Sequence, residues 1–183
     1  MKRFVFLLIF SALVLAFAMA QSAPAAEISF TFTRQSGSAS NQFAIWIENA
    51  QGQHVKTLYA TRWTANDGWR RRPTSIPLWV RQSGLSGVPR EQIDTVSGAT
   101  PRTGTLTYTW DGTDIRGAAV PAGNYVLILE GTLRWENKVY YRAPIRIGSG
   151  PASAQVSVEY TTGDRDTTAE RSMIRDVRVR ALR

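Results

Sequence analysis

Short runs of alternating apolar and polar residues recur along this chain, and they constrain its fold more than any other feature. Between residues 27 and 33, Ile28, Phe30 and Phe32 alternate with polar residues. A period of two places the apolar side chains on one face of a β-strand. Further strand-like runs cover residues 43–48, 54–63, 105–110, 124–134, 139–147, 155–161 and 173–182. Because short turns separate most of them, the sequence predicts an all-β fold, an immunoglobulin-like antiparallel β-sandwich.

The run 43–48 is apolar on both faces, which predicts a strand in the middle of a sheet. A turn over residues 49–53 follows, in which Gly52 is able to adopt a positive φ. His54 begins the returning strand, and we expect it to be an exposed surface residue rather than a ligand. In the last run, Val177, Val179 and Ala181 are expected to face the core, with Arg178 and Arg180 in solvent.

A single short helix is predicted between Ser75 and Gly84. Pro77 suits the first turn of a helix, and Gly84 ends the run. No other segment of the mature chain is expected to be helical. The fold prediction is therefore a sandwich with one short helix.

The first twenty residues have the parts of a secretory signal peptide. Lys2 and Arg3 are followed by the apolar run 4–17 and by a small-x-small cleavage site at 18–20. The apolar run is too short to favour a membrane span, although an N-terminal anchor helix is the alternative. We expect a periplasmic protein with a signal peptide over 1–20, a flexible leader over 21–26 and a single β-sandwich domain over 27–183.

Composition excludes several classes of chemistry. The chain has no cysteine and one histidine, which removes thiolate metal sites, haem attachment and redox dithiols. No Gly-x-Ser-x-Gly elbow and no calcium-loop spacing occur. The net charge is +8, and losing Lys2 and Arg3 lowers it by two to +6. Export argues against nucleic acid, so an anionic membrane surface, an acidic protein or a phosphate-bearing cofactor fits better; charge kept for solubility is the simplest interpretation.

Residues 110–125 contain two turns and an anchored strand. Trp110, Asp111 and Gly112 form the first turn, residues 120–123 form the second, and Tyr125 anchors the strand that follows. This pattern resembles the signature of the immunoglobulin-like domain of flagellar hook-capping proteins. The resemblance implies a fold and not a function.

A longer resemblance runs from about residue 30 to residue 147. It rests on the strand 45–48, the hairpin to residues 56–58, the short helix with Trp79, the segment 94–100 and the turn at 110–112. In this order they resemble a family of predicted periplasmic proteins, domain-of-unknown-function family 2271. The resemblance implies proximity to flavin transferases and membrane-bound electron-transfer proteins, and it gives no catalytic residues.

Residues 94–100 read Asp-Thr-Val-Ser-Gly-Ala-Thr, and they form the segment with the clearest chemistry. They resemble the flavin-attachment motif of extracytosolic flavoproteins, in which an acidic residue precedes Ser/Thr-Gly-Ala-Thr/Ser. In those proteins the last hydroxyl carries FMN through a phosphoester, so the resemblance implies covalent FMN on Thr100. The implied cofactor-binding set is Thr100, Asp94, Ser97, Gly98 and Ala99.

The acceptor hydroxyl is expected on a protruding, adaptable segment. Gly98 would let the backbone enter the active site of the transferase, and Ala99 would keep bulk away from the phosphate. Asp94 would position the segment or the metal of the transferase, and Ser97 would support it by hydrogen bonding. A plain loop between a helix and a strand is the alternative interpretation.

Tryptophans and arginines near the motif could shield and tune a flavin. The nearest in sequence are Trp69, Trp79, Arg70, Arg71, Arg72 and Arg81. The simpler alternative is that the tryptophans pack the edge of the sandwich and the arginines are hydrated.

These observations predict a periplasmic flavoprotein that carries FMN on Thr100 and acts in extracytosolic electron transfer. We expect an electron carrier and not an enzyme with its own substrate, with no metal site. A flavin transferase and a membrane-bound oxidoreductase are the expected partners, peripheral contact with a membrane is left open, and nucleic acid is not expected. The rival hypothesis is a cofactor-free immunoglobulin-like binding or accessory module.

Overall fold

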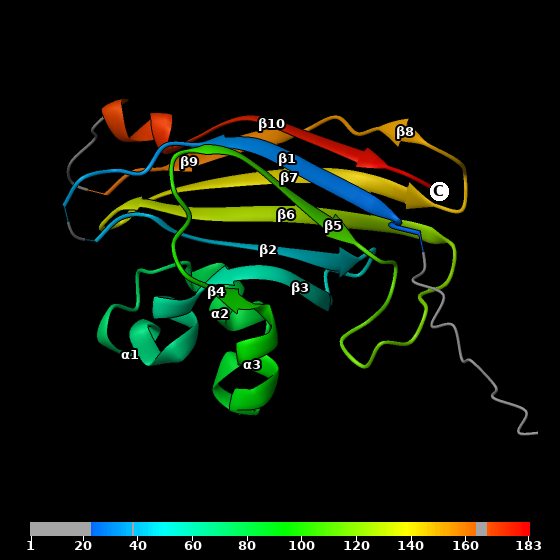
Figure 1. Cartoon of the computed structure of the whole chain (residues 1–183), viewed down its shortest axis with the longest axis horizontal. Helices are drawn as coiled ribbons and strands as arrows, with labels where there is room; N and C mark the ends of the chain where they lie inside the picture. Colours follow the sequence, from blue (N-terminus) through cyan, green and yellow to red (C-terminus); the bar gives the residue numbers. More distant parts are fainter. Residues whose placement is uncertain (1–22, 38, 164–167) are drawn as a thin grey trace, which may run out of the picture.

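The computed structural model describes residues 23–37, 39–163 and 168–183, so the expected signal peptide lies outside the described residues. Its strands form two sheets that enclose a common core (Figure 1). One sheet has the strand order β5-β1-β10-β8, and the other has the order β4-β3-β2-β6-β7-β9. The predicted all-β sandwich is confirmed.

Every strand-like run of the sequence forms a strand, and β4 and β8 are short additions of two residues each. The strands are β1 (Ala26–Phe32), β2 (Gln42–Asn49), β3 (His54–Thr61), β4 (Ser97–Gly98), β5 (Gly104–Trp110), β6 (Gly123–Arg134), β7 (Asn137–Ile147), β8 (Ala152–Ser153), β9 (Ser157–Thr161) and β10 (Ile174–Ala181). Most neighbours pair antiparallel, as predicted, but β3 and β4 pair parallel.

Strand β1 shows how the alternation builds the core. Its residues are alternately buried and half-buried, and it pairs antiparallel with both β5 and β10. Ile28, Phe30 and Phe32 are all buried, as the period of two predicts. The ring of Phe30 meets that of Phe43 on the other sheet, with centroids 5.6 Å apart. The two sheets therefore pack through aromatic side chains.

Strand β10 has the predicted two faces. Val179 and Ala181 are buried and Val177 is half-buried, all within the main core. Arg178 and Arg180 are exposed. This basic face points into solvent, as expected.

Strand β2 is central, as predicted, and its two faces enter two different cores. Phe43, Ile45 and Ile47 belong to the core between the sheets. Ala44 and Trp46 belong to a second core on the opposite face of the larger sheet. The strand is apolar on both sides because both of its faces are covered.

Short helical segments cover that second core. Figure 1 shows α1 (Trp69–Arg71), α2 (Pro77–Gln82) and α3 (Arg90–Val96) grouped together beside β3. Beneath them, Trp79, Ile76 and Leu85 are buried against residues of β2, β3 and β6. A layer of short helices thus turns one part of the sandwich into a three-layer region.

The expectation of one helix is wrong. Helix α2 lies where predicted, with Pro77 in its first turn. However, α1 and α3 are also helical, as are the short turns η1 (Thr64–Gly68), η2 (Leu85–Gly87) and η3 (Thr168–Met173). Helix α3 has no fully buried residue, and of its seven residues only Ile93 and Val96 are half-buried. Two apolar residues are too few to produce a recognisable helical period.

The expected leader contributes to the fold. Ala25 and Ala26 are fully buried, and β1 begins at Ala26. The amide of Ala25 donates to the carbonyl of Trp110, and its carbonyl accepts from Leu182. The domain therefore begins about two residues earlier than expected, because these backbone groups extend the sheet on both sides.

The predicted turns around residues 110–125 are present. Trp110 is buried, and its ring meets Tyr125 edge-on at 5.2 Å between centroids. The Tyr125 hydroxyl donates to the carbonyl of Pro121 at 2.8 Å. Gly112 has a φ of 75°, and Gly52 in the earlier hairpin has a φ of 74°. Both glycines adopt the left-handed conformation that these turns need.

Candidate functional site

The segment 94–100 is docked on the larger sheet and does not protrude as a loop. Asp94 lies on α3, and the chain then passes directly into β4. Ser97 pairs with Ala60 of β3, and Gly98 pairs with Thr61. The expectation of a protruding, adaptable loop is therefore wrong, because backbone hydrogen bonds to β3 hold the middle of the segment.

The side chain of Tyr59 fixes the next part of the segment. Its ring lies so close to Gly98 that a Cβ on this glycine would be 2.6 Å from Cε2 of Tyr59. Its hydroxyl donates to the carbonyl of Ala99 at 2.7 Å. Burial raises the pKa of Tyr59 to about 12, partly offset by Arg62, so the hydroxyl stays protonated at neutral pH. The close approach of Tyr59 is sufficient to explain why position 98 is a glycine. Entry of the backbone into the active site of a transferase is not needed as the reason.

The remaining motif residues differ in their surroundings. Asp94 and Ala99 are exposed, whereas Ser97 is buried. The Ser97 hydroxyl oxygen has no hydrogen-bond partner among the described residues. The structure therefore brings Ser97, Gly98 and Ala99 together along β3 and leaves Asp94 in solvent on the helix.

Thr100 is half-buried and borders a cavity of about 350 Å³. The other walls come from residues 34, 37 and 39–42, from Trp63 shortly after β3 and from Arg72 directly after α1. The cavity is lined by Thr100, Trp63, Arg72, Arg34, Asn41 and Gln42, among others. Thr100 thus lies beside two arginines and an aromatic ring that are distant from it in sequence.

Arg72 lines this cavity and has one buried donor without an acceptor among the described residues. Its Cζ lies 5.0 Å from the ring centroid of Trp63, and its Nη2 donates to Ser75 Oγ at 3.1 Å. Its Nε is buried and has no hydrogen-bond partner within the described part of the chain. Burial lowers the pKa of Arg72 from its ordinary value, but a guanidinium keeps its charge at neutral pH. A buried cationic N–H without an acceptor favours an anionic ligand here.

The tryptophans beside Thr100 are not those nearest in sequence. Trp79 is 1% exposed and belongs to the second core, so it packs the interior of the protein and is not available to shield a flavin. Trp69 packs against that core and stacks under Arg70 at 4.5 Å. Trp63, which the sequence did not single out, is 43% exposed at the Thr100 cavity. No local signal identifies Trp63, since it meets Thr100 only through the pairing of β3 with β4.

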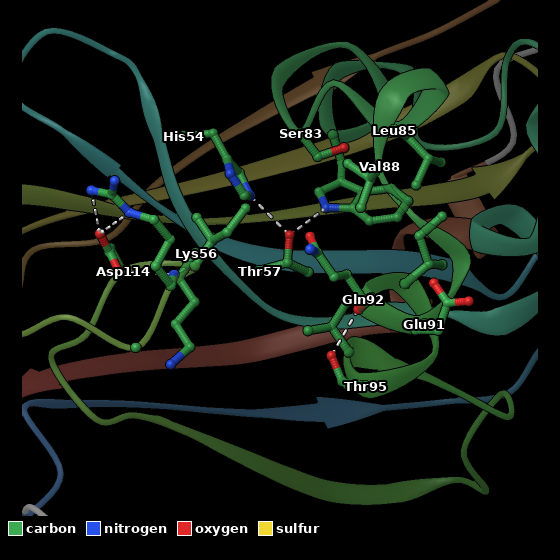
Figure 2. A pocket seen from close by; sticks show the side chains of 16 residues that line it. His54, Lys56, Thr57, Ser83, Leu85, Val88, Glu91, Gln92, Thr95 and Asp114 are labelled. Carbon is green, nitrogen blue, oxygen red and sulfur yellow. Dashed lines mark hydrogen bonds and ion pairs between the residues drawn. The ribbon is translucent and has the colours of Figure 1, made fainter.

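A second cavity, of about 580 Å³, has α3 as one of its walls (Figure 2). It is enclosed by β3, by α2 and η2, by α3 and by the loop at residues 114–117. Its apolar lining includes Trp79, Leu85, Val88, Ile93, Val96 and Ile115.

His54, Thr57 and Trp79 form a hydrogen-bonded triad at this second cavity. The indole Nε1 of Trp79 donates to Thr57 Oγ1 at 3.0 Å, and His54 Nε2 lies 2.8 Å from the same oxygen. Burial lowers the pKa of His54 to about 4, so its ring is neutral at neutral pH. His54 is half-buried, so the expectation of an exposed surface histidine is wrong: the β3 position was correct, but His54 lines a cavity together with α3 and the 114–117 loop.

Charged groups near the second cavity are largely paired. Lys56 Nζ lies 2.9 Å from Asp111 Oδ2, and Arg116 Nη2 lies 3.3 Å from Asp114 Oδ2. The described residues contain no cluster of three or more histidine, aspartate or glutamate side chains that could hold a metal ion. Within the same residues, no helix has the length and apolarity needed to cross a membrane.

Comparison with known proteins places most of this chain in one family model. The model described as "Predicted periplasmic protein (DUF2271)" matches residues 25–164, which include both cavities and the whole segment 94–100. No curated protein and no solved structure matches the chain.

Proposed function

We propose that this chain, which belongs to the family of predicted periplasmic proteins DUF2271, carries FMN covalently on Thr100 and transfers electrons in the periplasm. One observation carries the proposal. The half-buried Thr100 shares a cavity with Arg72, whose buried Nε has no acceptor among the described residues. A phosphoester on Thr100 would place an anion in the cavity that Arg72 also lines.

The attachment is a phosphoryl-group transfer catalysed by a flavin transferase with FAD as donor. Thr100 Oγ forms a bond to the phosphorus of the FMN half, the pyrophosphate P–O bond of FAD breaks, and AMP leaves. The hydroxyl proton passes to the transferase. Thr100 therefore supplies the covalent anchor, and its neighbours need only to hold the product.

The side chains around Thr100 fit a flavin phosphate and ring. Arg72 and Arg34 provide positive charge, and a guanidinium suits the geometry of phosphate oxygens. Trp63 offers a partly exposed aromatic ring for an apolar ring system. Tyr59 holds the carbonyl of Ala99 and so restricts the backbone that precedes the anchor. When bound, the flavin would supply the electron-transfer chemistry.

A second candidate, a cofactor-free binding module, has its own supporting observation. Ser97 and Gly98 are paired with β3, so the transferase would meet a segment that is already ordered. The cavity of about 580 Å³ does not include Thr100 and could serve binding without any flavin. These two functions are distinguished by whether the chain becomes flavinylated.

The test is co-expression of the full chain with a flavin transferase, followed by intact mass and in-gel flavin fluorescence. We expect an FMN-sized mass increase in the wild type and in Thr100→Ser, which retains a hydroxyl. Thr100→Ala should lose both signals. Thr95→Ala is the matched control, since Thr95 is an exposed threonine on α3, and it should retain both.

Two results would overturn the proposal. One is a wild-type chain that gains no mass although the transferase modifies a known substrate in the same cells. The other is a mass increase that persists in Thr100→Ala. A thermal melt of each variant, compared with the wild type, separates loss of the acceptor from loss of the fold.

A further inference from the structure

The second cavity has the size and lining of a small-molecule site. Its volume of about 580 Å³ lies within the range of roughly 300–1,000 Å³ that is usual for ligand pockets. Figure 2 shows side chains from β3, α2, η2 and α3 converging on it. Because these four elements and the loop at residues 114–117 all contribute walls, the cavity depends on the tertiary fold and not on one flexible loop.

Most of the wall is apolar and rigidly supported. Trp79 is 1% exposed and Leu85 is 5% exposed, and both belong to the second core. Val88, directly after η2, and Ile93 and Val96 of α3 complete this side. Packed apolar walls favour a ligand with an apolar, ring-sized body.

The triad of Trp79, Thr57 and His54 leaves a hydrogen-bond donor without a partner. The hydroxyl of Thr57 has one proton, and the neutral ring of His54 has one N–H. If Thr57 donates to His54 Nε2, the proton of His54 lies on Nδ1; if His54 Nε2 donates, the proton of Thr57 is left over. No hydrogen bond among the described residues uses either remaining proton. One donor of the His54–Thr57 pair, which lines the cavity, is therefore available to an acceptor.

The charges around the cavity do not select an ionic ligand. Lys56 and Arg116 are each ion-paired with an aspartate, and Glu91 is exposed at the rim. A charged ligand would have to leave water for apolar walls and would find no unpaired opposite charge on these two basic groups. Neutral molecules avoid this cost.

We propose that this cavity binds a neutral, mainly apolar ring compound whose carbonyl oxygen accepts a hydrogen bond from the His54–Thr57 pair. The site is separate from Thr100, and the proposal does not rest on flavin attachment. The apolar body lies against Trp79, Leu85 and Val96, and the carbonyl faces the His54–Thr57 pair.

The test uses two probes that differ by one carbonyl group: 1-tetralone and the hydrocarbon tetralin. Each is titrated into the full-length, ¹⁵N-labelled mature protein, and the indole N–H signal of Trp79 is followed by NMR. The signal is assigned from its absence in Trp79→Phe. We expect saturable shifts with 1-tetralone and roughly three- to tenfold weaker binding of tetralin, the range expected for one hydrogen bond.

Matched variants locate the site. Val88→Trp fills the cavity and should abolish binding of 1-tetralone. Val158→Trp makes the same change at a valine that is 51% exposed on β9, and it should leave binding unchanged, as should Thr100→Ala. Retention of the other indole signals shows that each variant is folded.

Three outcomes would overturn the inference. The first is the absence of saturable shifts up to the solubility limit of 1-tetralone. The second is equal affinity for the two probes, which would show that no donor in the site recognises the carbonyl group. The third is unchanged binding in a folded Val88→Trp variant, which would place the probe elsewhere.

Discussion

The ring of Tyr59 lies against the backbone of Gly98, and its hydroxyl donates to the carbonyl of the next residue, Ala99, at 2.7 Å. Tyr59 is in turn packed against Phe43 and Tyr108, with ring centroids 5.0 Å and 4.9 Å away. These contacts connect the segment that carries Thr100 to aromatic residues from both sheets. The position of Thr100 thus depends on the sandwich core.

Substitution of Gly98 by alanine is expected to destabilise the protein by about 1–3 kcal/mol, the usual cost of overpacking. The added Cβ would lie 2.6 Å from the Tyr59 ring, so either β4 or the ring must move. Urea denaturation measures the loss. The same substitution in a Tyr59→Leu background should cost less, because the ring is gone. Gly87→Ala is the control, since nothing lies within 4 Å of its added Cβ; equal losses at the two glycines would contradict the prediction.

Glu130→Gln is expected to remove the contribution of Glu130 to the pH dependence of stability. Glu130 is fully buried, and its carboxylate accepts amide protons from Leu78 at 3.1 Å and Trp79 at 2.7 Å. Burial raises the pKa of Glu130 from 4.5 to about 7, although these amides and Tyr140 oppose the shift. Since the folded-state pKa is raised, its contribution to stability is complete below pH 4.5 and is lost as pH rises through 7.

The size of this effect follows from the shift. A raised pKa of this extent lowers the free energy of unfolding by about 3 kcal/mol between pH 4.5 and 7. Urea midpoints of Glu130→Gln and wild type, measured across that range, give the difference. Glu91→Gln, an exposed glutamate on α3, should leave the wild-type profile unchanged. An identical profile in Glu130→Gln would show that Glu130 does not titrate in this range.

His54→Gln is expected to change the pH profile in the opposite direction. Burial lowers the pKa of His54 from 6.5 to about 4. Because the folded-state pKa is depressed, its contribution is complete above pH 6.5 and is lost as pH falls through 4. The contribution is at most about 3 kcal/mol, and partial exposure reduces it. Lys56, Asp114 and Arg116 line the same cavity and would modulate the midpoint.

The pH-dependent contributions of Glu130 and His54 to stability should partly cancel in the wild type. Between pH 4.5 and 6.5, Glu130 lowers and His54 raises the stability as pH increases. We therefore expect a shallow wild-type profile, a falling profile in His54→Gln and a rising one in Glu130→Gln. If His54→Gln and the wild type have the same slope in this range, then His54 is not a titrating group of the folded protein.

The strand content could be predicted because strand periodicity is a local property. Ile28, Phe30 and Phe32 reveal the buried face of β1 from their own spacing, and the apolar run of β2 reveals that both of its faces are covered. Helix α3 could not be found in this way. Its residues are mostly exposed, and only Ile93 packs against the second core, which is built from elements distant in sequence.

The sequence by itself determined the β-sandwich, the turns at Gly52 and Gly112, and the chemical identity of the segment ending at Thr100. Only the tertiary structure decided what surrounds that segment: β4 pairs with β3, Tyr59 packs on Gly98, and Arg72 and Trp63 reach the cavity of Thr100. The same holds for the His54 cavity, whose walls come from β3, α2, η2, α3 and the loop at residues 114–117. Alternation is encoded within a few consecutive residues, whereas a site is a set of long-range contacts that exists only after burial of apolar surface has brought those elements together.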